Sequence, residues 1–258
     1  LFEQKLLADQ LKWNTISTYM RMLRSVYNQA LERGVATYGP RLFNKVHTGI
    51  DCPVKRAVSP EVICKLMTDQ KPLPEKLAFS RDLFVLLFLL RGMPFVDLAF
   101  LRRCDLQGNV ITYHRRKTSR KLTVVVGKEA MEIIRRYMYA IPDSPYLFPI
   151  IQNPGENEYG QYTRMLRLLN HRLTQVANTL GIRERLSTYV ARHTWATTAL
   201  RQNYNSSLIC NAMGHSSVKV TETYFQPYRD DEVNRMNRSL ITYILSKKKR
   251  GIDKNIRS

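Results

Sequence analysis

The stretch that decides the fold consists of three short segments in the last third of the chain: TYVARHTWAT at 188–197, MGHSS at 213–217 and TETY at 221–224. Within it Arg192 stands 23 residues before His215, and Tyr224 stands nine residues after that histidine. These residues supply a fixed positive charge, an imidazole and a phenol that can act as a nucleophile. The chain lacks a GxxxxGK(S/T) nucleotide loop, a GxGxxG turn and an HExxH zinc helix, so those enzyme classes are excluded.

In order and spacing these segments resemble the tyrosine recombinases, also called phage-type integrases, in which HxxRHT is followed by LGHSS and then by a tyrosine nine residues after that histidine. The resemblance covers about residues 58–228 as the catalytic domain, whereas residues 1–50 resemble only the last helices of the family's core-binding domain. It implies a mainly α fold with a small antiparallel β-sheet. It also implies a site-specific DNA recombinase that cleaves and rejoins DNA through a 3′-phosphotyrosyl intermediate and a Holliday junction.

The resemblance also assigns roles to individual residues. Tyr224 is the expected nucleophile, and Arg192 is expected to stabilise the negative charge that builds on the phosphate. Lys117, in a Lys-Thr pair between two predicted strands, matches the family lysine that protonates the leaving 5′ oxygen. His215 is expected to donate a hydrogen bond to the scissile phosphate or to orient it. This chemistry requires neither ATP nor a metal ion, so no cofactor is expected.

Two positions depart from the family pattern. In RGMPFVDL, Pro94 stands where the family has its first catalytic arginine. Arg91 lies three residues earlier, close to one helical turn, and we expect it to reach the same phosphate from a shifted backbone position. Tyr189 replaces the first histidine of HxxR, and its phenol can donate a hydrogen bond to phosphate but lacks imidazole acid–base chemistry. Within the family, RGMPFVDLAFLRRCDL and TYVARHTWAT resemble integrases and invertases of Bacteroides-type mobile elements.

The charge of the chain favours a polyanionic partner. The 41 Lys and Arg residues against 21 Asp and Glu residues give a net charge of +20. Because Lys and Arg release counterions when they pair with phosphates, nucleic acid is the favoured partner and an anionic membrane surface comes second. Two basic groups are candidate double-stranded DNA contacts: Arg21 and Arg24 on a predicted helix, and Arg115, Arg116, Arg120 and Lys121 in a predicted hairpin tip. The helix residues could instead simply be solvated.

Sequence periodicity predicts two domains, one over 1–57 that includes a linker and one over 58–258. The resemblance implies that the first is a partial helical core-binding domain and the second the catalytic domain. The first contains a helix over 14–34, followed by a stretch rich in Gly and Pro. The second is expected to have a helix from Ser59-Pro60, two helices meeting at 91–94, strands over 109–114 and 122–126, and helices over 128–139, 161–180, 188–202, 206–213 and 217–225. A tail over about 229–258 is predicted to form an amphipathic helix that folds back on its own core, before a basic end at 247–250. The family resemblance implies instead that such a segment docks on a neighbouring subunit.

The remaining features indicate the cellular setting. The longest apolar run, Leu83–Leu90, is far too short to span a bilayer, and the amino end lacks a signal-peptide pattern. The four cysteines are scattered without a CxxC pair, as in a reducing compartment. We expect a bacterial cytoplasmic protein, associated with the nucleoid and without a membrane partner. The chain does not begin with Met, which suggests a fragment of a longer protein.

Several alternatives stay open from the sequence. A relative that has lost the usual first arginine and the motif histidine could bind DNA sites without cleaving them. A type IB topoisomerase would share the tyrosine chemistry but relax DNA without exchanging partners, and a basic protein that binds RNA or a membrane surface is a third alternative. The family resemblance implies a homotetramer on two DNA duplexes and leaves open whether a host DNA-bending protein assists.

Overall fold

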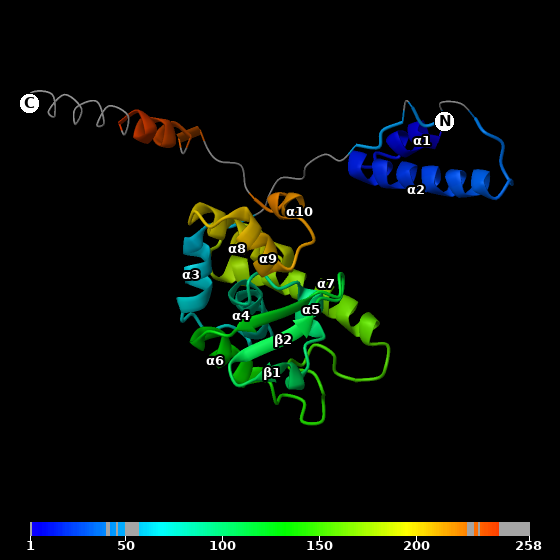
Figure 1. The fold of residues 1–258 in the computed structure, drawn as a ribbon. Helices are drawn as coiled ribbons and strands as arrows, with labels where there is room; N and C mark the ends of the chain where they lie inside the picture. The colour runs from blue at the N-terminus through cyan, green and yellow to red at the C-terminus, as the bar shows by residue number, and fades with distance from the viewer. Residues whose placement is uncertain are drawn as a thin grey trace, which may run out of the picture. The chain divides into compact units, whose positions relative to one another are not determined.

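A computed structural model describes residues 2–39, 42–44, 46–49, 57–225, 230–231 and 233–242. It divides the chain into two units, Leu1–Val54 and Lys55–Ser258, which are described separately below (Figure 1). The sequence places the domain boundary near residue 57.

The first unit is a pair of helices, α1 (Phe2–Ala8) and α2 (Trp13–Glu32). Its small core consists of Leu6, Ile16 and Met20, with Leu11, Phe43 and Val46 packed against it. The apolar spacing along α2 produces this buried stripe. The predicted DNA-contacting residues Arg21 and Arg24 lie on the exposed side of α2, and Arg21 donates from Nε to the carbonyl of Ser17 at 3.2 Å.

The second unit combines short and long helices with one small sheet (Figure 1). The sheet is antiparallel in the order β1-β2-β3, formed by Leu106–Gln107, Val110–His114 and Lys121–Val125. The predicted fold class, mainly α with a small antiparallel sheet, is confirmed. The helices are α3 (Pro60–Thr68), α4 (Glu75–Leu89), α5 (Phe95–Ala99), the 3₁₀ helix η1 (Arg103–Asp105), α6 (Lys128–Tyr137), α7 (Glu158–Thr179), α8 (Thr188–Arg201), α9 (Ser206–Met213) and α10 (Val218–Glu222).

Helix α4 forms the centre of the second unit. Leu83, Phe84, Leu86 and Leu87 are fully buried, and α4 contacts α3, α6, α7 and α8. A helix that is apolar on all sides belongs in a protein core, which accounts for the longest apolar run of the sequence. Because α8 packs against α4, the burial of these side chains holds α8 in place. The candidate functional residues lie on the face of α8 that is covered by the segment after it.

The β2–β3 hairpin carries the basic residues 115–121 in its turn and at the start of β3. The strands pair from Val110 with Val125 to His114 with Lys121, and residues 115–120 form the connecting turn. In this turn the N–H of Ser119 donates to the carbonyl of Arg115 at 2.7 Å. Ile111 and Tyr113 face the core, so the alternation of the strand directs residue 115 toward the same side.

Part of the predicted tail helix is described: residues 233–242 are helical, with Val233, Met236, Leu240 and Ile241 exposed. The predicted basic end at 247–250 lies outside the described residues. Within the described ranges, none of the helices combines the length and the apolar character needed to span a membrane.

Candidate active site

Helix α8 positions four side chains that face one site. Ser187 caps the helix, its Oγ accepting from the N–H of Val190 at 3.4 Å. Tyr189, Arg192, His193 and Thr197 follow at spacings of three and four, which places them on neighbouring parts of one helix face. The segment from α9 to residue 225 packs over this face, because Ala196, Ile209, Met213, Tyr224 and Phe225 form a second core cluster.

Arg192 is buried, with a residue exposure of 2%. Its guanidinium donates to the carbonyl of Gly92, to the carbonyl of Met213 at 3.0 Å and to Nε2 of His215 at 2.6 Å. Burial lowers the pKa of Arg192, and the charge of Arg115 lowers it further. In the described part of the chain, these three hydrogen-bond acceptors are all neutral. A buried cation without a carboxylate partner is a strong attractor for an anion.

His215 is held as a neutral imidazole with a defined tautomer. Because a guanidinium N–H can only donate, Nε2 of His215 accepts from Arg192, and the ring proton resides on Nδ1. Nδ1 donates to Oγ1 of Thr221 at 2.7 Å. Burial, followed by the charges of Arg192, Arg115 and Lys117, lowers the pKa of His215 to about 3. The histidine is therefore uncharged at neutral pH.

Gly214 allows the hairpin to approach the His215 segment closely. Gly214 ends α9 in the left-handed region with φ +66°, and the backbone N–H of His215 donates a hydrogen bond to the carbonyl of Cys210 at 3.0 Å. A Cβ at this position would lie 2.7 Å from Cδ1 of Leu122 and 2.8 Å from Cδ of Arg115. Both the backbone conformation and the space require glycine.

Tyr224 follows α10 and is buried against the site, with a residue exposure of 9%. Its backbone carbonyl accepts from Nδ1 of His193 at 3.1 Å and from Oγ1 of Thr197 at 3.2 Å. Its ring stacks on that of His215, with centroids 5.0 Å apart, and lies 5.4 Å from the guanidinium carbon of Arg192. The tyrosine is thus placed beside the predicted arginine and histidine of its own chain.

Tyr189 contacts the hydroxyl group of Tyr224. The two hydroxyl oxygens are 2.7 Å apart and the ring centroids are 5.7 Å apart. Although the residue is 58% exposed, its hydroxyl end lies against Tyr224, and partial loss of water there, followed by the hydrogen bond to Tyr224 and the charge of Tyr224 when ionised, raises the pKa of Tyr189 to about 12. Tyr189 therefore keeps its proton throughout the physiological range.

Arg115, predicted as a DNA contact in the hairpin tip, is buried beside Arg192 and Tyr224. Its guanidinium donates to Oδ2 of Asp97 at 3.2 Å and to the carbonyls of Met213 and Gly214 at 2.9 and 3.1 Å. The residue is 7% exposed. The alternation of β2 explains this placement, because residue 115 continues the buried series of Ile111 and Tyr113.

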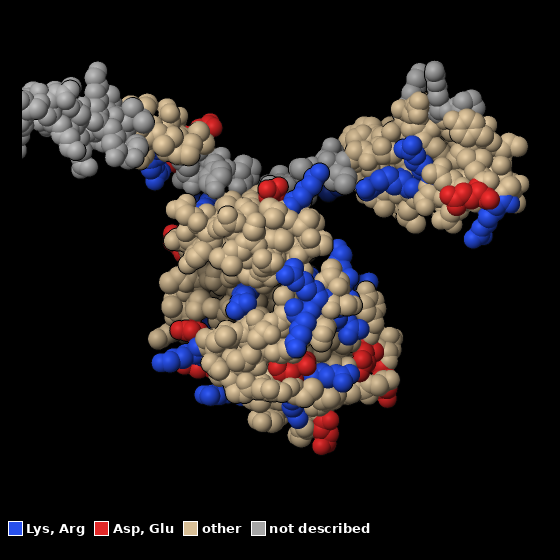
Figure 2. All heavy atoms as spheres, viewed as in Figure 1, with Lys and Arg blue, Asp and Glu red and all other residues tan. Residues whose placement is uncertain are grey.

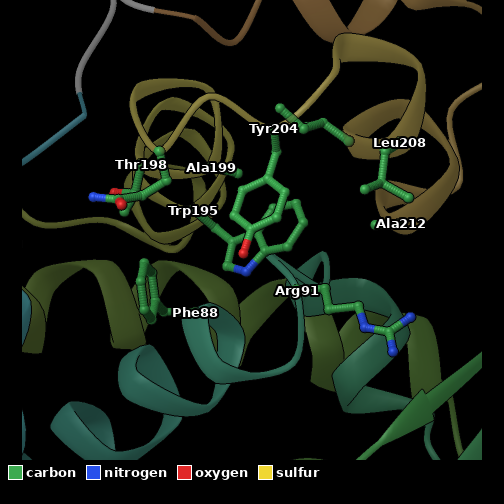
Figure 3. Close-up of a pocket in the computed structure, with 10 residues that line it drawn as sticks. Phe88, Arg91, Trp195, Thr198, Ala199, Tyr204, Leu208 and Ala212 are labelled. Carbon is green, nitrogen blue, oxygen red and sulfur yellow. The ribbon is translucent and has the colours of Figure 1, made fainter.

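The Arg91 side chain does not line the hollow that the other predicted catalytic residues share, contrary to the expected shift by one helical turn. The prediction required residues 91–94 to be helical. Arg91 and Gly92 instead have positive φ angles of 60° and 65°, so the chain is not helical at these residues. The Arg91 side chain donates to the carbonyl of Thr123 at 3.2 Å. It lines a different, apolar cavity and points away from Trp195 and Tyr204 (Figure 3).

The remaining predicted residues lie in or around the hairpin tip. Lys117 joins Arg115, Tyr189, Arg192, His215 and Tyr224 around a hollow of about 460 Å³. Lys and Arg side chains gather on the sheet-bearing face of this unit (Figure 2).

The other three basic residues of the tip differ in their contacts. Arg120 donates to the carbonyl of His215 at 2.8 Å and to Oδ1 of Asn211 at 3.0 Å, which ties the hairpin to α9. The guanidinium of Arg116 stacks over the ring of Phe100 at 3.7 Å, and the backbone N–H of Arg116 donates to Oδ1 of Asp97 at 3.0 Å. Lys121 is exposed at the end of β3.

Sequence reasoning missed four supporting residues: Asp97, His193, Thr197 and Thr221. His193 contacts the Tyr224 carbonyl and so holds the backbone of the predicted nucleophile. The spacing of 189, 193 and 197 on one helix was the available signal. No sequence signal marked Asp97 or Thr221, because Asp97 is distant along the chain from Arg115, and Thr221 is separated from His215 by a turn.

Three solved structures that share this fold are a recombinase and two integrases. The chain is similar to XerA recombinase, with a TM-score of 0.54 and 18% identity over 91% of this chain and 78% of that one. It is similar to the Tn1549 transposon integrase in complex with transposon right-end DNA, with a TM-score of 0.62 and 16% identity over 93% of this chain and 83% of that one. It is also similar to a lambda integrase dimer bound to a COC′ core site, with a TM-score of 0.63 and 12% identity over 86% of this chain and 76% of that one. At these identities the likeness shows a shared fold.

The family follows from the sequence itself. Residues 56–230, well over half of the chain, match the phage integrase family, so the chain belongs to that family and is a tyrosine-class site-specific recombinase. No curated protein matches the chain.

Proposed function

We propose that the protein cleaves and rejoins specific DNA sites through a covalent bond between Tyr224 and a 3′ phosphate, and that strands are exchanged through a Holliday junction. The observation that supports this most strongly is the buried guanidinium pair beside Tyr224. Arg115 has the carboxylate of Asp97 as partner, whereas the described acceptors of Arg192 are neutral. A phosphodiester entering the hollow would supply the missing negative charge.

The proposed cleavage step uses only residues of this chain and water. A water molecule takes the proton of the Tyr224 hydroxyl as its oxygen attacks phosphorus. The new O–P bond forms while the bond between phosphorus and the 5′ oxygen breaks. The Lys117 ammonium donates a proton to that oxygen, which leaves as a hydroxyl. The reverse sequence rejoins the strand, so the bond energy is conserved in the phosphotyrosyl link.

Charge on the phosphate is stabilised in this proposal by Arg115 and Arg192. Guanidinium groups bind phosphate oxygens with two parallel hydrogen bonds and stay charged when buried. Arg115 takes the role first assigned to Arg91, because Arg115 lines the hollow with Tyr224 and Arg91 lines another cavity. His215 orients Arg192 through Nε2, rather than donating its own proton to the phosphate from that atom.

The partner in this proposal is double-stranded DNA carrying the recombination site. Arg116, Lys121 and, in the first unit, Arg21 and Arg24 are the proposed phosphate contacts, because these side chains lie outside the buried site. Such contacts would position the duplex without reading its sequence. Arg120 is proposed to hold the hairpin on α9 instead.

The finer assignments are also proposals. The phrases around Arg91 and Arg192 support a relationship to integrases and invertases of Bacteroides-type mobile elements. The working assembly would be a homotetramer on two duplexes, with or without a host DNA-bending protein. A protein that acts on such elements would work at the bacterial nucleoid.

A strand-cleavage assay tests the proposal. Nicked suicide substrates prepared from pooled genomic or element-end DNA would be incubated with the chain and with Tyr224→Phe, and denaturing gels with mass mapping would locate covalent adducts. An adduct on Tyr224, lost in the variant, would support the proposal. DNA binding that is salt-sensitive but never yields an adduct would favour a non-cleaving relative, and relaxation without junction formation would favour a type IB topoisomerase.

A further inference from the structure

The nucleophile of the proposed reaction has a second phenol beside its reactive atom. The Tyr189 and Tyr224 hydroxyl oxygens are 2.7 Å apart, and both side chains are held by the same face of α8. The ring of Tyr189 packs edge-on against His193, with centroids 5.2 Å apart, and His193 donates to the Tyr224 carbonyl. Both ends of Tyr224 are therefore fixed by one helix.

Resting on the proposed function, we infer that Tyr189 acts on the nucleophile: its hydroxyl donates a hydrogen bond to the Tyr224 oxygen and stabilises that oxygen as it loses its proton and attacks phosphorus. This differs from the contact with a phosphate oxygen expected from the sequence. The assignment makes Tyr189 a partner of the reacting oxygen in cleavage, and a partner of the same oxygen when it leaves in the rejoining step.

The donor capacity of a phenol supports this assignment. A tyrosine hydroxyl carries one hydrogen, so a hydrogen bond given to Tyr224 cannot also be given to a phosphate oxygen. Once Tyr224 has lost its proton, its oxygen can only accept, and Tyr189 becomes the donor by necessity. The high pKa of Tyr189, about 12, keeps this hydrogen in place. A phenolate oxygen still has a lone pair for phosphorus while it accepts one hydrogen bond.

The step balances without any additional reactant. The Tyr224 proton passes to water, the Tyr224 oxygen bonds to phosphorus, and the 5′ oxygen leaves with a proton from Lys117. Tyr189 keeps its own proton from start to finish. Its hydrogen bond is strongest when the Tyr224 oxygen carries most negative charge, which is the condition for a contribution to rate.

A neutral phosphate analogue separates action on the nucleophile from action on the phosphate. Adduct formation would be timed with wild-type chain, Tyr189→Phe and Arg192→Ala, on the mapped suicide substrate and on the same substrate with a methylphosphonate at the cleaved position. Tyr139→Phe is the matched control, because that tyrosine is 68% exposed and lies just after α6, away from the hollow. DNA affinity and melting temperature would be recorded for each variant.

We expect Tyr189→Phe to slow adduct formation on the order of ten-fold, as for loss of a hydrogen bond to a charged group, and by a similar factor on both substrates. Arg192→Ala should be much less defective on the neutral substrate, since less charge needs stabilising there. Tyr139→Phe should match wild type.

Two outcomes would overturn the inference while leaving the proposed function in place. One is an unchanged rate in Tyr189→Phe, and the other is a defect seen only with the charged phosphodiester, which would assign the hydroxyl to the phosphate. If the wild-type chain forms no adduct on any substrate, the proposed function itself fails and the inference fails with it.

Discussion

Nη2 of Arg192 lies 2.6 Å from Nε2 of His215, and this hydrogen bond connects the charge of the site to the protonation state of its histidine. The guanidinium occupies the lone pair that would otherwise take up a proton. Thr221 accepts the other ring hydrogen at 2.7 Å, so the imidazole has no open position for acid–base work. His215 thus serves in the structure to orient Arg192, and its role in the reaction follows from that contact.

Acidification should destabilise the protein through His215. In the unfolded chain this histidine titrates near its ordinary pKa of 6.5, whereas in the folded state the pKa is about 3. Between these values the unfolded state binds more protons, so stability falls as the pH falls below 6.5. Lowering the pH from 7 to 5 should cost about 1 to 2 kcal/mol from this group.

Urea unfolding at pH 7 and pH 5 would measure the effect in wild type, His215→Gln and His171→Gln. His171 is an exposed histidine on α7 and serves as the matched control. His215→Gln should show the smaller loss between the two pH values, and His171→Gln should follow wild type. Equal pH dependence in all three proteins would contradict the neutral, buried histidine.

Arg115, and not Arg91, should be required for cleavage. Removing a group that stabilises transition-state charge costs roughly a hundred-fold or more in rate, so Arg115→Ala should lose adduct formation while Arg91→Ala keeps most of it. Suicide-substrate kinetics would make the comparison. Because Arg115 pairs with the buried Asp97, melting temperatures and the milder Arg115→Lys would separate a chemical defect from unfolding. Strong loss in Arg91→Ala together with an active Arg115→Ala would restore the original assignment.

Lys117 should be dispensable when the leaving group needs no proton. A 5′-bridging sulfur leaves as a thiolate without protonation, so Lys117→Ala should be slowed about a hundred-fold on the ordinary substrate and recover near wild-type rate on the sulfur substrate. Lys121→Ala is the control from the same hairpin: it should weaken DNA binding without a substrate-dependent change in rate. A Lys117→Ala defect that persists with sulfur would assign this lysine to phosphate contact instead.

The two arginine assignments show what sequence alone could and could not predict. The helices and the hairpin followed from apolar spacing and from turn residues, and the order of Arg192, His215 and Tyr224 predicted their meeting. The basic run of the hairpin gave no separate signal for Arg115, although extending the alternation of Ile111 and Tyr113 would have directed it inward. Arg115 and Arg116 are adjacent in the chain, yet Arg115 is buried and Arg116 stacks on Phe100.

Backbone geometry was the second reason why the sequence did not predict every site residue. The expectation for Arg91 assumed that a shift of three residues equals one helical turn, and the positive φ of Arg91 and Gly92 removes that turn. Contacts between distant residues, such as Tyr189 with Tyr224 and Asp97 with Arg115, depend on how α8, the hairpin and the last segment pack together. Spacing along the chain does not encode them.

Gly214→Ala should disrupt the site more than the same change at another glycine of similar conformation. Gly181, after α7, has φ +64° and nothing within 4 Å of where a methyl group would lie, whereas a methyl group at Gly214 would lie 2.7 Å from Leu122 and 2.8 Å from Arg115. Both substitutions incur the left-handed strain of about 1 kcal/mol. Only Gly214→Ala must also move the hairpin, so its total loss should be about 2 kcal/mol or more.

The hairpin carries Arg115 and Lys117, so this displacement should reach the chemistry. A shift of about 1 Å in a catalytic group can cost on the order of a hundred-fold in rate. Unfolding curves and adduct kinetics for the two variants would test the difference: Gly181→Ala should cleave like wild type, and Gly214→Ala should not. If both variants cleave equally well, the close approach of Gly214 to the hairpin is not needed to hold Arg115 and Lys117 in register with Tyr224.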